Sequence, residues 1–115
     1  MFAKAVDQFR AALAQDPKIK EAHFYMGVLF ENGLAVDKDF TTAFRNYKAA
    51  SELNYPKAFT KCGNLYYSGK GVPRVDKTEA FNFFKRGALA GDTEAMNSAG
   101  LMLENGFDAI PADHM

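Results

Sequence analysis

The sequence has one cysteine, two histidines, no tryptophan and no long apolar run. With Cys62 alone, an internal disulfide and a cysteine-based metal cluster are both excluded. A lone thiol suits a reducing compartment, so we expect a cytoplasmic protein. No stretch reaches the about 18 apolar residues that a membrane-spanning helix needs. The first ten residues also lack the uninterrupted apolar segment of a secretory signal.

The charges cancel, with 14 basic and 14 acidic side chains. No overall field therefore draws the chain to nucleic acid or to an anionic membrane, and neither is predicted as a partner. Residues 55–86 hold seven basic against two acidic side chains, whereas residues 87–115 hold five acidic ones and no Lys or Arg. Ordinary solvated surface and a charge-complementary partner site both explain this layout. The length of 115 residues fits a single domain, 1–115.

Small, aromatic and glycine residues recur at a fixed spacing. One set of four positions occurs three times, first 36 and then 37 residues apart: Ala22, Gly27, Phe30 and Gly33; Ala58, Gly63, Tyr66 and Gly69; Ala95, Gly100, Leu103 and Gly106. A fixed period of this length is typical of a solenoid.

Apolar residues at helical spacing predict six helices, over 3–15, from about 18 or 20 to 32, and over about 40–53, 57–68, 77–90 and 93–105. Gly33 and Gly69 should end their helices, because glycine adopts the left-handed conformation without steric cost. A glycine inside a helix costs about 0.5–1 kcal/mol relative to alanine. The interior Gly27, Gly63 and Gly100 therefore need a compensating reason, and we expect an aromatic ring of the following helix to pack against each.

The repeated positions resemble Sel1-like repeats, a relative of the tetratricopeptide repeat. The second copy carries the pattern most fully, with Ala58, Cys62-Gly63, Tyr66, Gly69-Lys70-Gly71-Val72, Asp76, Ala80, Phe81, Phe84 and Gly91. Residues 22–106 take part in the resemblance. The first copy departs from it, since Ala35 stands where the second loop glycine belongs. Ala5, Phe9, Ala12 and Pro17 resemble the second helix of a tetratricopeptide repeat.

The resemblance implies an all-α fold, a right-handed α-α superhelix of antiparallel helix pairs with about six helices. We divide the chain into a leading helix (1–17), repeat 1 (22–57), repeat 2 (58–94), the first helix of an incomplete repeat 3 (95–106) and a tail (107–115). Solenoid ends need polar caps, and neither end has one. Met96, Leu103, Phe107 and Ile110 suggest that the chain continues or that a partner covers this end.

No catalytic, metal or cofactor site is predicted. His23 and His114 each stand alone, without the paired spacing of a zinc site. Cys62 occupies the slot that Met26 and Ala99 fill in the other copies, so we expect a buried packing residue. The glycine-rich loop after Ser68 lacks the sequence of a phosphate-binding loop. Asp76 should cap the helix that it precedes.

The function predicted from the sequence is binding of a partner on one surface of the solenoid. In this architecture the first helix of each pair lines the concave face, and twelve positions should point outward from it: Glu21, Phe24, Val28, Glu31, Lys57, Thr60, Asn64, Tyr67, Glu94, Asn97, Leu101 and Glu104. Aromatic anchors among polar groups suit peptide recognition. We expect a non-catalytic scaffold or adaptor that binds other proteins or peptides, with Asn64 and Tyr67 at the centre of the groove.

Two other functions stay open at this point. The solenoid could be a spacer or assembly element that makes contacts, including end-to-end ones, through its uncapped terminal helices. More weakly, the resemblance also allows a hydrolase-like activity, because some Sel1-like proteins have been linked to hydrolysis of cell-wall-type substrates.

Overall fold

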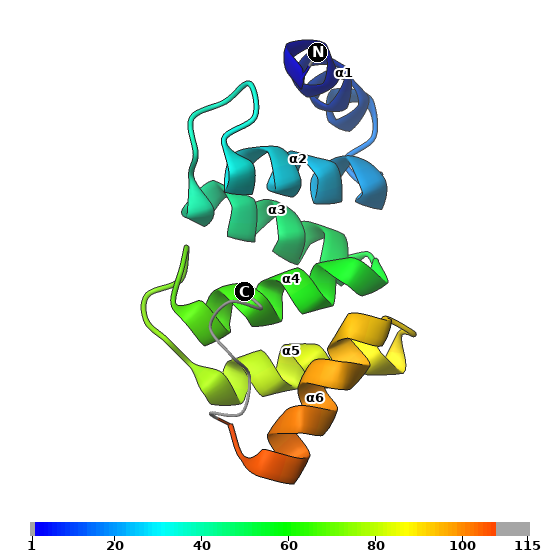
Figure 1. The fold of residues 1–115 in the computed structure, drawn as a ribbon. Coiled ribbons are helices and arrows are strands. Elements are labelled where there is room, and N and C mark those ends of the chain that lie inside the picture. The colour runs from blue at the N-terminus through cyan, green and yellow to red at the C-terminus, as the bar shows by residue number, and fades with distance from the viewer. Residues whose placement is uncertain (1, 108–115) are drawn as a thin grey trace.

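The computed structural model describes residues 2–107, which form six helices and no strand (Figure 1). Ile110 and His114 lie outside the described residues. The helices are α1 (Phe2–Gln15), α2 (Lys20–Asn32), α3 (Phe40–Glu52), α4 (Pro56–Ser68), α5 (Lys77–Leu89) and α6 (Thr93–Asn105). The predicted all-α fold of about six helices is confirmed.

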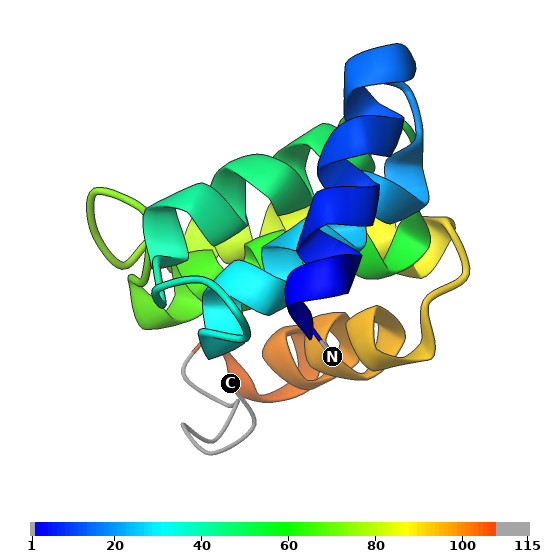
Figure 2. The ribbon, with the colours of Figure 1, turned by 90° about the horizontal axis from the view of Figure 1, so that it is seen from above.

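The helices stack along one direction, with α1 at one end and α6 at the other (Figure 1). The stack measures 44 × 26 × 23 Å. The closest packing is within the pairs α2 and α3, and α4 and α5. Seen from above, α3 and α6 lie on opposite sides of the stack (Figure 2). Each helix packs mainly on its neighbours in sequence, as expected of a solenoid.

Glycine and aspartate mark the helix ends. Gly33 (φ 66°) and Gly69 (φ 73°) take the predicted left-handed conformation, and their amides donate to carbonyls four residues back. Asp39, Asp76 and Asp92 accept hydrogen bonds from the amides of the first turns of α3, α5 and α6. The predicted cap by Asp76 is thereby confirmed, at 3.0 Å from the Glu79 amide.

The interior glycines are explained by close packing of aromatic rings. A Cβ on Gly27 would lie 2.7 Å from the Tyr47 ring, and one on Gly63 would lie 2.6 Å from the Phe84 ring. Both rings are completely buried. Glycine therefore lets α3 approach α2, and α5 approach α4, as predicted. Gly100 differs, because no other part of residues 2–107 comes within 4 Å of where its Cβ would stand.

The buried side chains form one central cluster between α2 and α5, with a smaller cluster at each end of the stack. The central cluster holds Phe24, Tyr47, Phe59 and Phe83, together with the small residues that let the helices approach. Phe83 has no aromatic counterpart in α3, where Asn46 stands at the same position, so the comparison of repeats did not identify it.

Candidate partner-binding surface

Two hollows lie along the side of the stack formed by α2, α4 and α6. The first has a volume of about 320 Å³ and is lined by Phe24, Tyr25, Val28, Lys57, Thr60, Lys61, Asp92 and Glu94. The second has a volume of about 510 Å³ and is lined by Asn64, Glu94, Met96, Asn97, Ser98, Gly100, Leu101 and Glu104. Glu94 borders both, so the two hollows form one surface, which we call the groove.

Nine of the twelve residues predicted from the sequence line these hollows. The three that do not are Glu21, Glu31 and Tyr67. Side chains exposed to solvent are those of Glu21, Lys57, Glu94, Asn97 and Glu104, and partly exposed ones are those of Val28, Glu31, Asn64 and Leu101.

For three of the twelve residues, the prediction that the side chain is exposed and can contact a partner is wrong. Phe24, Thr60 and Tyr67 are only 5%, 1% and 6% exposed, respectively. Their side chains point toward the next helices of the stack rather than into solvent. The neighbouring helices therefore bury more of the circumference of an inner helix than the sequence analysis assumed when it divided each helix into one buried and one exposed face.

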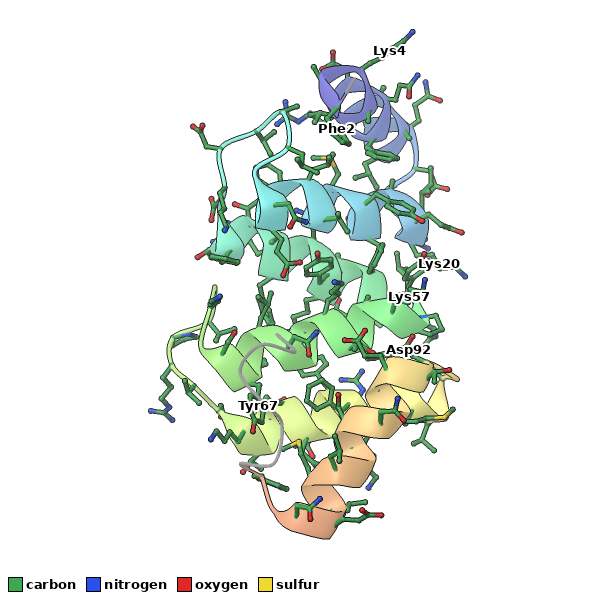
Figure 3. The ribbon with its side chains drawn as sticks, viewed as in Figure 1. Phe2, Lys4, Lys20, Lys57, Tyr67 and Asp92 are labelled. Carbon is green, nitrogen blue, oxygen red and sulfur yellow. The ribbon has the colours of Figure 1, made fainter. Side chains whose placement is uncertain are left out.

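Each of the three has its own packing partner. Phe24 lies 4.7 Å from the Tyr55 ring and 5.5 Å from the Tyr47 ring, between centroids. The hydroxyl of Thr60 donates to the Asp92 carboxylate at 2.5 Å, which ties α4 to the start of α6. The hydroxyl of Tyr67 donates to the backbone carbonyl of Phe107 at 2.7 Å, beyond the end of α6. Figure 3 shows Tyr67 in the last turn of α4, beside the start of α5.

Glu31 is engaged inside the fold. Its carboxylate accepts a hydrogen bond of 2.5 Å from the Tyr47 hydroxyl. Burial, followed by this bond, raises the pKa of Tyr47 well above its usual range. The phenol therefore stays protonated and keeps donating, which leaves Glu31 less able to bind a partner.

The sequence prediction missed part of the groove lining. Tyr25, Lys61 and Asp92 line the first hollow, and Met96 and Ser98 line the second. Lys57 and Asp92 lie near each other where α4 begins and α5 ends (Figure 3). Asp92 could have been found from the sequence as the N-cap residue of the last helix. That position brings its carboxylate to the N-terminal end of α6.

The charges divide along the groove. The first hollow carries Lys57 and Lys61 beside two carboxylates. The second carries Glu94 and Glu104 without any Lys or Arg, together with amide side chains and the apolar Leu101. The second hollow thus offers hydrogen-bond acceptors and negative charge around an apolar contact.

Cys62 and His23, the two side chains considered as reactive groups, both have structural contacts in the fold. Cys62 is fully buried, and burial raises the pKa of its thiol to about 12, so it is protonated near neutral pH. His23 Nε2 lies 2.8 Å from the Pro17 carbonyl oxygen, to which it donates.

Among residues 2–107, no three His, Cys, Asp or Glu side chains are arranged to hold a metal ion. Within the same residues, no helix has the length and apolar character to cross a membrane.

Comparison with known proteins supports the resemblance seen in the sequence. The family model described as Sel1 repeat matches residues 20–55, 57–92 and 93–115. A search of curated protein sequences finds no match to this chain.

Two solved structures are similar to the stack. A Sel1 repeat protein from Oxalobacter formigenes superimposes with a TM-score of 0.81 at 28% identity, over 96% of this chain and 44% of that protein. A protective antigen of uropathogenic Escherichia coli with an SLR fold gives a TM-score of 0.81 at 32% identity, over 87% of this chain and 21% of the antigen. The chain therefore spans less than half of the length of either protein.

Proposed function

The chain belongs to the Sel1 repeat family, and we propose that it is a protein-interaction module that binds a partner through the groove along α2, α4 and α6. Sel1 repeats generally mediate protein interactions. The observation that carries the proposal is the continuity of the two hollows, which offer about 320 and 510 Å³ beside each other. A single extended or helical segment of a partner can occupy both.

The lining favours a particular kind of ligand. Because the α4–α6 hollow holds Glu94 and Glu104 without a cation, we propose that it receives a segment with Lys or Arg beside an apolar side chain. Leu101 supplies the apolar contact. Asn64 and Asn97 supply donors and acceptors for the backbone of the segment.

Site-specific photo-cross-linking tests this assignment. A photoreactive residue at Asn97, which is exposed in the groove, should cross-link a partner in extracts of the source cells. The same residue at Asn82, an exposed position on α5, is the matched control. We expect cross-links from position 97 that are much weaker at position 82, and mass spectrometry of the product gives the bound segment.

Substitutions then separate binding from folding. Asn64→Ala and Leu101→Ala should weaken capture of the cross-linked segment, whereas Asn82→Ala should not. Phe24 and Tyr67 are unsuitable for this purpose, since their burial makes alanine there a test of stability. Equal capture by the groove variants and by the control would refute the assignment.

We further propose that the module has no catalytic activity of its own. Support comes from the buried, protonated thiol of Cys62 and from the bond that holds the His23 ring to Pro17. Turnover of a cell-wall-type substrate that disappears in Cys62→Ala or His23→Ala would contradict this and would favour the hydrolase alternative.

A cytoplasmic location is also a proposal. It is supported by the single free thiol, because proteins of oxidising compartments more often carry paired cysteines. Cell fractionation with detection of the chain tests it, and recovery from an oxidising compartment would contradict it.

A further inference from the structure

The first hollow of the groove, between α2 and α4, has an apolar wall on its α2 side. Val28 and Tyr25 line this wall, and Tyr25 is 45% exposed. The Tyr25 ring is held by two neighbours, since it stacks on Phe9 with ring centroids 6.0 Å apart and meets Phe24 edge-on at 5.3 Å. The wall therefore offers a partner an exposed aromatic surface that loses little freedom on binding.

Two ammonium groups stand on the α4 side of the same hollow. Lys57 is exposed, Lys61 is partly buried, and both line the hollow. They lie four residues apart on α4, so their side chains leave the same face of the helix. Within residues 2–107, neither Lys57 nor Lys61 makes an ion pair with a carboxylate. Both positive charges are thus available to a ligand.

The carboxylates that border the hollow have other roles. Oδ2 of Asp92 accepts hydrogen bonds from the Thr60 hydroxyl and from the Ala95 amide. Asp92 also caps α6, where the positive end of the helix dipole stabilises its charge. Glu94 is exposed and is shared with the second hollow. Between α2 and α4, the charges that face a ligand are therefore mainly the two cations.

Lys57 opposes the electrostatics of its own helix. It is the second residue of α4 (Figure 3), and the same repeat position holds Glu21 in α2 and Glu94 in α6. The helix dipole stabilises an acidic side chain in a first turn and destabilises a basic one. An acidic residue would thus make α4 more stable, as in α2 and α6. A residue that lowers local stability is expected where it serves binding.

We propose that the α2–α4 hollow binds an acidic side chain of the partner segment together with an apolar neighbour. The carboxylate pairs with Lys57 and Lys61, and the apolar side chain lies on Tyr25 and Val28. This inference rests on the groove proposed above, whose second hollow receives Lys or Arg. The ligand then carries acidic charge over α2 and α4 and basic charge over α4 and α6. The order of charges along its sequence sets the direction in which it lies.

Peptide selection tests this order of charges. A phage-displayed library of random peptides is selected on the wild-type chain, and clones that bind Leu101→Ala equally well are discarded. The retained peptides depend on the groove. We expect them to hold Asp or Glu beside an apolar residue in one half, and Lys or Arg in the other half.

Charge reversal tests the two lysines. Synthetic copies of the retained peptides, followed by fluorescence anisotropy, should bind Lys57→Glu with Lys61→Glu about tenfold or more weakly, because charged hydrogen bonds are lost. A peptide whose Asp or Glu is replaced by Lys should prefer this variant over the wild type. The matched control is Lys18→Glu with Lys20→Glu, which changes the net charge equally at exposed positions outside the hollow. It should bind the retained peptides like the wild type.

Circular dichroism checks that the variants keep their helices. If the reversal reduces helicity, Lys57→Gln with Lys61→Gln takes its place and should weaken binding in the same direction. Retained peptides that bind this variant and the wild type equally would overturn the inference and leave the groove in place. An equal loss in the control would overturn it too, since that indicates attraction to net charge rather than to a site. If no selected peptide depends on Leu101, the proposed groove is wrong and the inference fails with it.

Discussion

Replacing Gly63 by alanine tests the close approach of α5 to α4. The added Cβ would lie 2.6 Å from Phe84 Cε1 and 2.8 Å from its Cδ1. The ring is completely buried, so it cannot move into solvent. We expect the clash to cost about 1–3 kcal/mol, the range for overpacking a well-packed core. The gain in helix propensity offsets about 0.5–1 kcal/mol of this.

Gly100 offers the matched control, because it occupies the same repeat position in α6. The new methyl group of Gly100→Ala meets no other part of the described chain within 4 Å and carries the same gain in helix propensity. The difference in unfolding free energy between the two variants therefore isolates the clash, at about 1–3 kcal/mol. The unfolding entropy for 115 residues is about 0.24 kcal/mol/K, so melting temperatures should differ by about 4–12 °C.

Urea and thermal unfolding, followed by far-UV circular dichroism, measure this difference. The double variant Gly63→Ala with Phe84→Leu should recover part of the loss, with a coupling of at least about 0.5 kcal/mol, because leucine is smaller and can rotate away from the new methyl group. Gly63→Ala with a stability equal to or above that of Gly100→Ala would refute the close-approach explanation. A double variant whose losses simply add would refute it as well.

Further predictions concern the loop, the caps and the thiol. Ala35 adopts φ 64°, so Ala35→Gly should stabilise the chain by about 0.5–1 kcal/mol in urea unfolding, since alanine is strained in the left-handed region. Thr60→Val removes the hydrogen bond to Asp92 and should lower the unfolding free energy by about 1–3 kcal/mol. Hydrogen bonds from the Thr42 side chain and amide lower the pKa of Asp39, so its ionised form adds stability at neutral pH. That stability is present above the unfolded pKa of about 3.9 and is lost as the pH falls through the folded value, so the advantage of the wild type over Asp39→Asn should shrink in acid. Cys62 should react with a thiol reagent at mildly alkaline pH only after unfolding, since burial raises its pKa to about 12; rapid labelling of the folded chain would contradict its burial.

The helices could be predicted from the sequence because their signals are local and repeated. Apolar spacing, Gly33, Gly69 and the helix-capping Asp76 act within a few residues of the helix that they define. The close approach at Gly27 and Gly63 was also predictable, since the repeat shows an unfavourable residue retained at one position. These predictions depend only on contacts within one helix or between helices that are adjacent in the sequence.

The groove was predicted less well because its residues depend on contacts between distant parts of the chain. Thr60 is buried by a bond to Asp92, 32 residues away, and Tyr67 by a bond to Phe107, 40 residues away. A helical wheel contains no information about such partners. It also assumes that one side of an inner helix stays free, whereas the superhelix covers part of that side with the next pair.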